Sequence, residues 1–158
     1  MTDVRLAFVD TYVLREVGRP QEDLQVLVLR RGRTGRCPGS WETVHGTIEP
    51  GETPVQASLR ELHEETGFTP ARLYNVSRVE AFYQHGTDAV ALIPVFVAFV
   101  SASEPPRLSS EHDEALWLGP ADAATRFSWP RERRALEDIV ALFGKGGGGL
   151  LEDVLRVC

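Results

Sequence analysis

Runs of apolar and β-branched residues recur along the chain and predict a series of strands. In the first run, Phe8, Asp10 and Tyr12 would face one side of a sheet, and the residues between them would face the other. A later run is almost continuously apolar, which is typical of a strand covered on both faces. The predicted strands are residues 4–14, 24–29, 41–45, 72–84, 89–100 and 115–118.

Glycine, proline and small polar residues mark the connections between these strands. Residues 85–88 predict a hairpin turn, and residues 16–23 predict an earlier turn. Residues 101–110 predict a loop. Pro94 has no N–H to donate, so its strand lies at a sheet edge or carries a bulge there.

Residues 53–67 predict a helix whose two ends are both marked. Thr53 and Gln56 form a capping box, and Pro54 suits the first helical turn. Gly67 supplies the left-handed residue that ends the helix. Helical spacing places Val55, Leu59, Leu62 and Thr66 on one face and Glu61, Glu64 and Glu65 on another.

Two further helices are predicted to begin at Gly119-Pro120 and Trp129-Pro130. In the second, Leu136, Ile139, Val140 and Phe143 recur at helical spacing. Residues 144–149 predict a flexible glycine-rich linker. Residues 150–158 are then either a docked terminal helix or a loosely held tail.

The acidic end of the helix at 53–67 is unfavourable on local grounds. Glu61, Glu64 and Glu65 repel one another and oppose the helix dipole, each by a few tenths of a kcal/mol. A divalent cation with oxygen ligands would relieve both penalties. Mg²⁺ suits this set, with Mn²⁺ as a substitute, and the backbone carbonyl of Gly46 is a further candidate ligand. The alternative is a solvated acidic helix end.

This stretch resembles the signature of the Nudix hydrolases. The pattern G-x5-E-x7-R-E-U-x-E-E-x-G-U, where U is a bulky apolar residue, is filled at each fixed position. The matching residues are Gly46, Glu52, Arg60, Glu61, Leu62, Glu64, Glu65, Gly67 and Phe68. The resemblance implies the Nudix fold, an α+β architecture in which an α/β/α sandwich surrounds a mixed central sheet.

The resemblance also implies roles for individual residues. Glu61, Glu64 and Glu65 would bind the metal, and Arg60 would hold a glutamate in place. Glu52 would stabilise the loop or touch the metal through water. Glu61 and Glu65 are candidates for deprotonating the attacking water, and Glu111, outside the signature, is another.

Candidate substrate contacts lie outside the helix. Arg30 and Arg31 follow a predicted strand, and arginine binds phosphate oxygens bidentately, although a solvated loop is the alternative. Phe82 and Trp41 are candidates for stacking on a ring, with the core as the alternative for each. We group Glu52 with these contacts. The four histidines form no His-x3-His pair, so zinc chemistry is not indicated.

Two further features are similar to the branch of dATP pyrophosphohydrolases and dihydroneopterin triphosphate diphosphatases. They are Val44-His45-Gly46 and the arrangement of Glu111-His112 before Trp117-Leu118. The similarity implies Mg²⁺-dependent cleavage of a dATP-like nucleoside triphosphate or a pterin triphosphate to the monophosphate and pyrophosphate. An asymmetric dinucleoside tetraphosphate hydrolase is an alternative, although Ala115 stands where that group often has tyrosine. A catalytically silent nucleotide-binding module is a third.

Composition narrows these classes. With 158 residues, 42% of them hydrophobic, we expect one domain spanning residues 1–158. The net charge of −6 disfavours a duplex nucleic-acid partner. Two cysteines without a C-x-x-C pair, the lack of a signal-like N-terminus and an apolar run of only about 12 residues favour a cytoplasmic protein without a membrane partner. The expected partner is a small nucleotide-type substrate. The oligomeric state stays open, a homodimer included.

Overall fold

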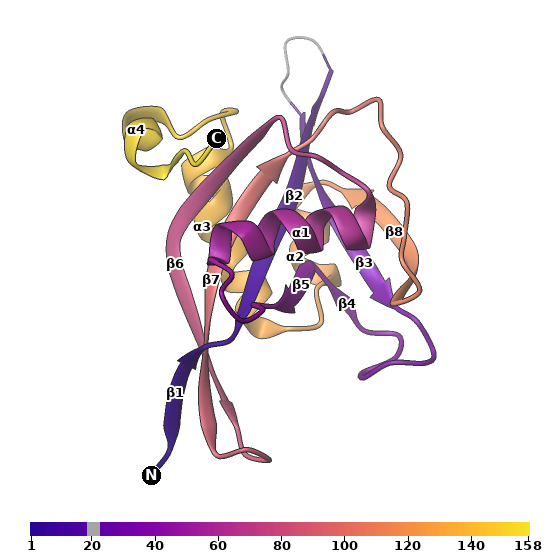
Figure 1. Cartoon of the computed structure of the whole chain (residues 1–158). Helices are drawn as coiled ribbons and strands as arrows, with labels where there is room; N and C mark the ends of the chain where they lie inside the picture. Colours follow the sequence, from indigo (N-terminus) through magenta and orange to yellow (C-terminus); the bar gives the residue numbers. More distant parts are fainter. Residues whose placement is uncertain (19–22) are drawn as a thin grey trace.

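The computed structural model describes residues 1–18 and 23–158, and Figure 1 shows how their strands and helices are arranged. The strands are β1 (Asp3–Leu6), β2 (Phe8–Val17), β3 (Asp23–Arg31), β4 (Trp41–Glu42), β5 (Val44–Thr47), β6 (Arg72–Gln84), β7 (Ala89–Phe99) and β8 (His112–Leu118). The helices are α1 (Pro54–Thr66), α2 (Pro120–Arg126), α3 (Pro130–Phe143), the 3₁₀ turn η1 (Gly149–Leu151) and α4 (Glu152–Leu155). The turn predicted at residues 16–23 falls mainly on 19–22, which lie outside the described residues.

Strand β2 lies at the centre of a mixed sheet. It pairs in parallel with β7 from Asp10 to Leu14, and it pairs antiparallel with β5 at one end and with β3 at the other. Strand β8 extends the sheet beyond β3, and β6 lies on the far side of β7. Because β5 leads directly toward α1, this pairing fixes where that helix begins relative to the sheet.

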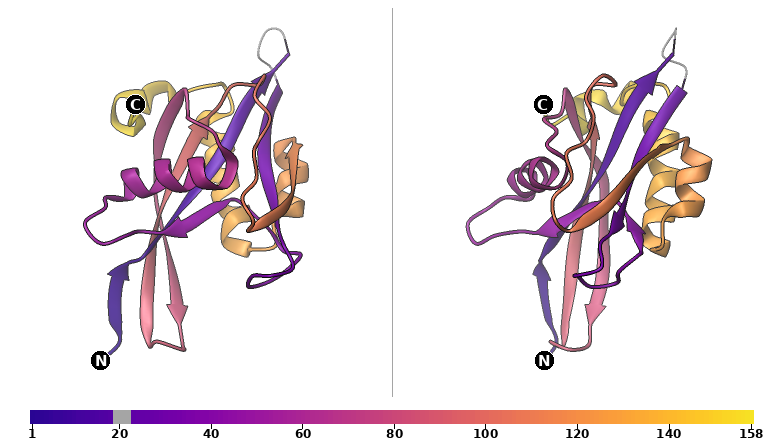
Figure 2. Two further views of the ribbon diagram at one scale, coloured as in Figure 1. Left: turned by 45° about the vertical axis from the view of Figure 1, so that its right-hand side comes forward. Right: turned by 90° about the vertical axis from the view of Figure 1, so that its right-hand side faces the viewer.

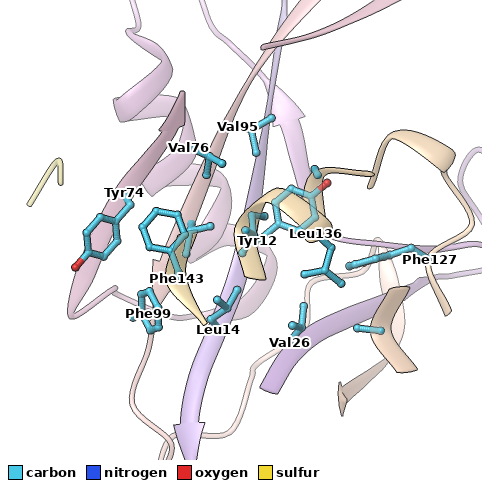
Figure 3. Close-up of a cluster of buried hydrophobic side chains, with 14 of the residues drawn as sticks. Tyr12, Leu14, Val26, Tyr74, Val76, Val95, Phe99, Phe127, Leu136 and Phe143 are labelled. Carbon is cyan, nitrogen blue, oxygen red and sulfur yellow. The ribbon is translucent and has the colours of Figure 1, made fainter. Parts of the chain in front are cut away.

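Helices cover both faces of the sheet, as Figure 2 shows in two views. Helix α1 packs on one face over a cluster that includes Val9, Leu27 and Leu62. Helices α2 and α3 pack on the other face over a larger cluster, and Figure 3 shows Tyr74 and Phe143 within it, with ring centroids 4.8 Å apart. The predicted α+β fold, an α/β/α sandwich around a mixed sheet, is confirmed.

Three strand predictions need correction. The run at residues 4–14 forms two strands, because the strand is interrupted at Ala7. Strand β7 pairs with β1 before this residue and with β2 after it. Residues 41–45 also form two strands, β4 on β3 and β5 on β2. The chain crosses between them at Thr43, whose backbone N–H donates to Glu132 Oε2 at 2.6 Å. The strand predicted at residues 115–118 is longer, since β8 begins at His112.

The two interpretations of Pro94 are now separated. Strand β7 has β6 on one side and β1 and β2 on the other, so the edge interpretation is wrong. The irregularity lies opposite Pro94, in β6, where the register shifts between Asn75 and Val79. Ser77, inside this bulge, has a φ of 56°. The extra residues therefore allow the strands to stay paired around a proline.

Helix α1 has the ends that its sequence predicts. The capping box between Thr53 and Gln56 is present on both sides, and Gly67 has a φ of 75°. The predicted division of faces is wrong at Glu65, however, which is 2% exposed while the Glu64 side chain is 57% exposed. Glu65 lies three residues after Leu62 and seven after Ser58, which are both buried, so helical spacing turns it toward the packed face.

The later helices also begin where predicted, at Pro120 and Pro130. In α3 the predicted apolar face is buried except for Val140, which is 37% exposed. The segment at residues 150–158 is docked, since Leu155 is 4% exposed and Arg156 bridges to Tyr74 in β6. Within the described ranges, no helix has the length and apolar character needed to cross a membrane.

The packing of α1 can be tested at Leu62, which is fully buried between helix and sheet. We expect Leu62→Ala to lower the free energy of unfolding by about 2–5 kcal/mol, because it removes buried surface and leaves a cavity. Leu150→Ala is the matched control, since Leu150 is fully exposed, and we expect it to change stability by less than about 0.5 kcal/mol. Urea titration followed by circular dichroism measures both, and equal losses would contradict this packing.

Candidate active site

Arg60 ties α1 to the loop that precedes it. Its Nε and Nη2 donate to the two carboxylate oxygens of Glu52 at 2.8 and 2.9 Å, and Nη2 also donates to the Thr47 carbonyl at 2.8 Å. Its Nη1 donates to Glu61 Oε1 at 2.7 Å. The guanidinium lowers the pKa of Glu52 to about 2, so this carboxylate stays charged. The loop is therefore closed by a bidentate ion pair.

Strand β5 passes directly beneath Glu61. A Cβ added at Gly46 would lie 2.0 Å from Glu61 Cδ, so no side chain fits at this position. Gly46 is itself held in the sheet opposite Val9 of β2. The backbone of the sheet thus supports the carboxylate from below.

Glu65 is the most unusual group on this face. It is 2% exposed, and neither carboxylate oxygen has a hydrogen-bond partner among the described residues. Burial raises the pKa of Glu65 well above its usual value, and the charges of Glu61, Glu111 and Glu42 raise it further, while the nearby backbone N–H of His45 opposes the rise. A buried, unpartnered carboxyl is costly, so this position favours a proton or a bound cation.

Glu111 approaches the same region from the turn before β8. The backbone N–H of Gly32, at the end of β3, donates to the Glu111 carbonyl at 2.9 Å and fixes this turn. Burial raises the pKa of Glu61; Arg60 opposes the rise, and the charges of Glu64 and Glu111 add to it. The charge of Glu111 raises the pKa of both Glu61 and Glu65, so its carboxylate is close enough to interact with them electrostatically.

The carboxylates are suited to an oxygen-ligand cation, although they do not form a ready-made cage. Within residues 1–18 and 23–158, no group of three or more His, Cys, Asp or Glu side chains is spaced to hold a metal as placed. Glu61 and Glu64 contact Arg60 at 2.7 and 3.4 Å. Two observations still fit a metal: the unpartnered Glu65 oxygens and the side-chain-free space of Gly46 beside Glu61.

A buried chain of charged groups lies behind Glu65. His112 Nε2 is 2.9 Å from Glu42 Oε1, and Arg31 Nη1 donates to the same oxygen at 3.0 Å. Burial alone would raise the pKa of Glu42, but His112 and Arg31 hold it below its usual value. His112 Nδ1 is 4.0 Å from Glu65 Oε2. The sequence interpretation missed Glu42, because nothing in a two-residue strand marks a buried carboxylate.

A second buried carboxylate, Asp10, lies on the neighbouring strand β2. It is within 2.7 Å of His45 Nδ1 and accepts from Arg131 Nε at 2.9 Å. Burial would raise its pKa, but His45 and Arg131 lower it, so Asp10 is charged. Arg131 belongs to α3 and is distant in sequence, so the sequence interpretation missed this group as well.

A pocket of about 300 Å³ lies beside these groups and shares Glu42 and His45 with them. It brings together residues from strands β2 to β7, from the loop between β3 and β4 and from the start of α3. Its aromatic walls are Phe8, Phe82 and Trp129, and its cationic groups are Arg31, Arg36 and Arg131. Aromatic surfaces next to cationic groups suit a planar ring that carries phosphates.

Only some of the residues predicted to contact the substrate line this pocket. Arg31 and Phe82 line it. Arg30 and Trp41 do not: Arg30 pairs with Asp113 and Glu114 at 2.7 Å, and Trp41 packs against the larger core. Alternation along β3 sends Arg30 and Arg31 to opposite faces, which separates their environments.

Comparison with known proteins gives a family match. The model of the NUDIX domain matches residues 9–139. The chain is 31% identical over 131 residues to a Myxococcus xanthus protein named octanoyltransferase, covering 78% of this chain and 34% of that protein. The chain spans about a third of the length of the curated relatives that it matches.

Solved structures show the same fold at lower identity. A Caenorhabditis elegans Ap4A hydrolase is 21% identical with a TM-score of 0.69, covering 85% of this chain and 94% of that one. The Escherichia coli dihydroneopterin triphosphate pyrophosphohydrolase is 22% identical with a TM-score of 0.63, covering 87% and 99%.

The support of Glu61 by Gly46 is open to test. We expect Gly46→Ala to lower the free energy of unfolding by about 1–3 kcal/mol, because the new methyl group displaces Glu61 or the strand. Gly86→Ala is the control, since an added Cβ at Gly86 meets no atom within 4 Å. Its stability should change by less than about 0.5 kcal/mol in denaturant titration. If Gly46→Ala left the free energy of unfolding unchanged, helix α1 and strand β5 would have to be further apart than in this structure.

Proposed function

The chain belongs to the Nudix family, and we propose that it is a Mg²⁺-dependent pyrophosphohydrolase acting on a nucleoside triphosphate or pterin triphosphate. The products would be the monophosphate and pyrophosphate. The observation that carries this proposal is the buried Glu65 carboxyl, which has no hydrogen-bond partner among the described residues and whose pKa is raised further by the charges of Glu61 and Glu111. Three converging carboxyl groups suit cation-assisted attack of water on a phosphoanhydride.

The proposed metal ligands are Glu61, Glu64, Glu65 and the carbonyl of Gly46. At these residues Mg²⁺, or Mn²⁺ in its place, would supply neutralisation of the phosphate charge and activation of the attacking water. Arg60 holds Glu61 in position at 2.7 Å, and through Glu52 it keeps the preceding loop closed. Arg60 is thus a positioning residue in this proposal.

Glu65 is our first candidate for the group that accepts the proton from the attacking water. In the metal-free chain, burial and nearby carboxylates raise its pKa well above the usual value, so this carboxyl binds a proton readily when it is not coordinated to the cation. Glu61 shares this tendency more weakly, because Arg60 opposes it. Glu111 is the alternative from outside the helix.

The pocket supports a substrate with a planar ring. Its volume of about 300 Å³ is at the lower end for ligand sites, and its aromatic walls suit a nucleobase or pterin. Arg36 is placed to meet phosphate oxygens, as is Arg31 if it releases Glu42. The name of the E. coli neighbour supports the pterin triphosphate option. The name of the C. elegans neighbour supports a dinucleoside tetraphosphate as the second candidate.

A substrate panel in oxygen-18 water distinguishes these candidates. dATP, dihydroneopterin triphosphate and diadenosine tetraphosphate are each incubated with Mg²⁺, and mass spectrometry identifies the products and the labelled phosphorus. Pyrophosphate release from a triphosphate supports the first candidate. Preferential formation of ATP from diadenosine tetraphosphate supports the second, and hydrolysis of no compound contradicts both.

The same assay tests the carboxylates. We expect Glu64→Gln and Glu65→Gln to lower kcat by about 10²–10⁴-fold, because each removes a charged oxygen from the site. Glu137→Gln on α3 is the control, since Glu137 is exposed and remote from the pocket, and its kcat should match that of the unaltered protein. Full activity of Glu65→Gln would remove Glu65 from the mechanism.

The lining of the pocket allows a separate prediction about substrate affinity. Phe82 and Tyr83 are adjacent, exposed aromatic residues of β6, but only Phe82 lines the pocket. We expect Phe82→Ala to raise KM about tenfold with little change in kcat, in line with the loss of about 1–3 kcal/mol for a stacked base. Tyr83→Ala should leave KM unchanged. Equal effects of the two variants would show that the ring binds elsewhere.

A further inference from the structure

Strand β1 lies on a part of the sheet that no helix covers. Figures 1 and 2 show β1 and the hairpin of β6 and β7 projecting together away from the helices. All four residues of β1 are exposed, with Val4 at 62% and Leu6 at 47%. The edge of an exposed strand presents unpaired N–H and C=O groups, with which a strand of another chain can pair.

The hydrogen bonds to β7 show which backbone groups of β1 are free. Asp3 N–H donates to Asp88 at 3.2 Å, and Ala7 N–H donates to Leu92 at 3.1 Å. Because neighbouring residues in a strand alternate direction, Val4 and Leu6 direct their N–H and C=O groups to the opposite edge. This edge can therefore accept a further strand along Val4 and Leu6, up to Ala7, whose carbonyl already accepts from the Ile48 N–H at 2.9 Å.

The side chains of β1 also alternate between the two faces of the sheet. Val4 and Leu6 lie on one face. The pairing of β1 with β7, and of β7 with β6, places Val4 in one cross-strand row with Tyr83 and Leu6 in another with Ala81. Val79 of β6 continues this apolar surface and is 58% exposed. Asp3 and Arg5 lie on the opposite face and carry opposite charges.

From this pattern we propose that β1 pairs antiparallel with β1 of a second copy, about a two-fold axis at Val4. In this register each Asp3 lies opposite the partner's Arg5, and Val4 exchanges backbone hydrogen bonds with the partner's Val4. The sheet then continues from one copy into the other, and the apolar rows of the two copies become adjacent.

The charges of Asp3 and Arg5 favour the register with its axis at Val4 over the registers with an axis one residue away. An axis at Arg5 would place two arginines directly opposite each other, and an axis at Asp3 would do the same for two aspartates. Opposite charges across a strand pair are stabilising and like charges are destabilising. The strand is therefore self-complementary in one arrangement, which is the property that a two-fold interface requires.

A charge-swap experiment tests the proposal, with sedimentation velocity reporting the mass against the 17.5 kDa of one chain. The unaltered protein should form a dimer at micromolar to tens of micromolar concentration. Asp3→Arg alone and Arg5→Asp alone should each raise the dimer Kd at least tenfold, because each converts two attractive pairs into two repulsive ones. An equimolar mixture of the two variants should recover a dimer, since one strand then carries two arginines and the other two aspartates.

Controls keep the result interpretable. Arg134→Asp changes the same charge on the exposed side of α3 and should leave the dimer Kd unchanged. Circular dichroism of each variant checks that the fold is retained. A protein that stays monomeric at 100 μM or more would overturn the proposal, and so would a dimer that both single variants leave intact. Neither result bears on hydrolysis, because the experiment measures mass alone.

Discussion

The contact between Gly46 and Glu61 is the constraint on which the site depends. A helix and a strand can approach this closely only where the strand has no side chain, and a Cβ at Gly46 would lie 2.0 Å from Glu61 Cδ. Arg60, the neighbour of Glu61 on α1, then reaches back to Thr47 and Glu52. The helix, the strand and the loop between them are thus fixed by one close approach and one guanidinium.

The close approach forces negative charges together. Glu65 is carried into the space between α1 and the sheet, where its carboxyl has no hydrogen-bond partner in the described part of the chain. Burial of such a group destabilises the fold unless a proton or a cation compensates. Local rules are often broken in this way at functional sites, and here the unfavourable group lies within 4.0 Å of His112, whose partner Glu42 lines the pocket.

Two buried carboxylates of the sheet support the pocket. Asp10 and Glu42 are both buried, and each is held charged by a histidine and an arginine. These pairs fix the orientation of His45 and Arg31, which line the pocket. Tyr12, on the same face of β2 as Asp10, packs edge-on against Phe127, so the core on the face away from α1 supports Asp10.

The sequence by itself determined the features that depend on neighbouring residues. The ends of α1 follow from Thr53, Gln56 and Gly67, and the hairpin of β6 and β7 follows from the turn between two apolar runs. The nine residues of the signature indicated the family and the acidic site. Only the tertiary structure decided the pairing of Asp10 with Arg131, 121 residues apart, and of Glu42 with His112, 70 residues apart. It also decided that Glu65 is buried and that residues 41–45 divide between two neighbours, because burial and strand pairing depend on which distant segment lies alongside.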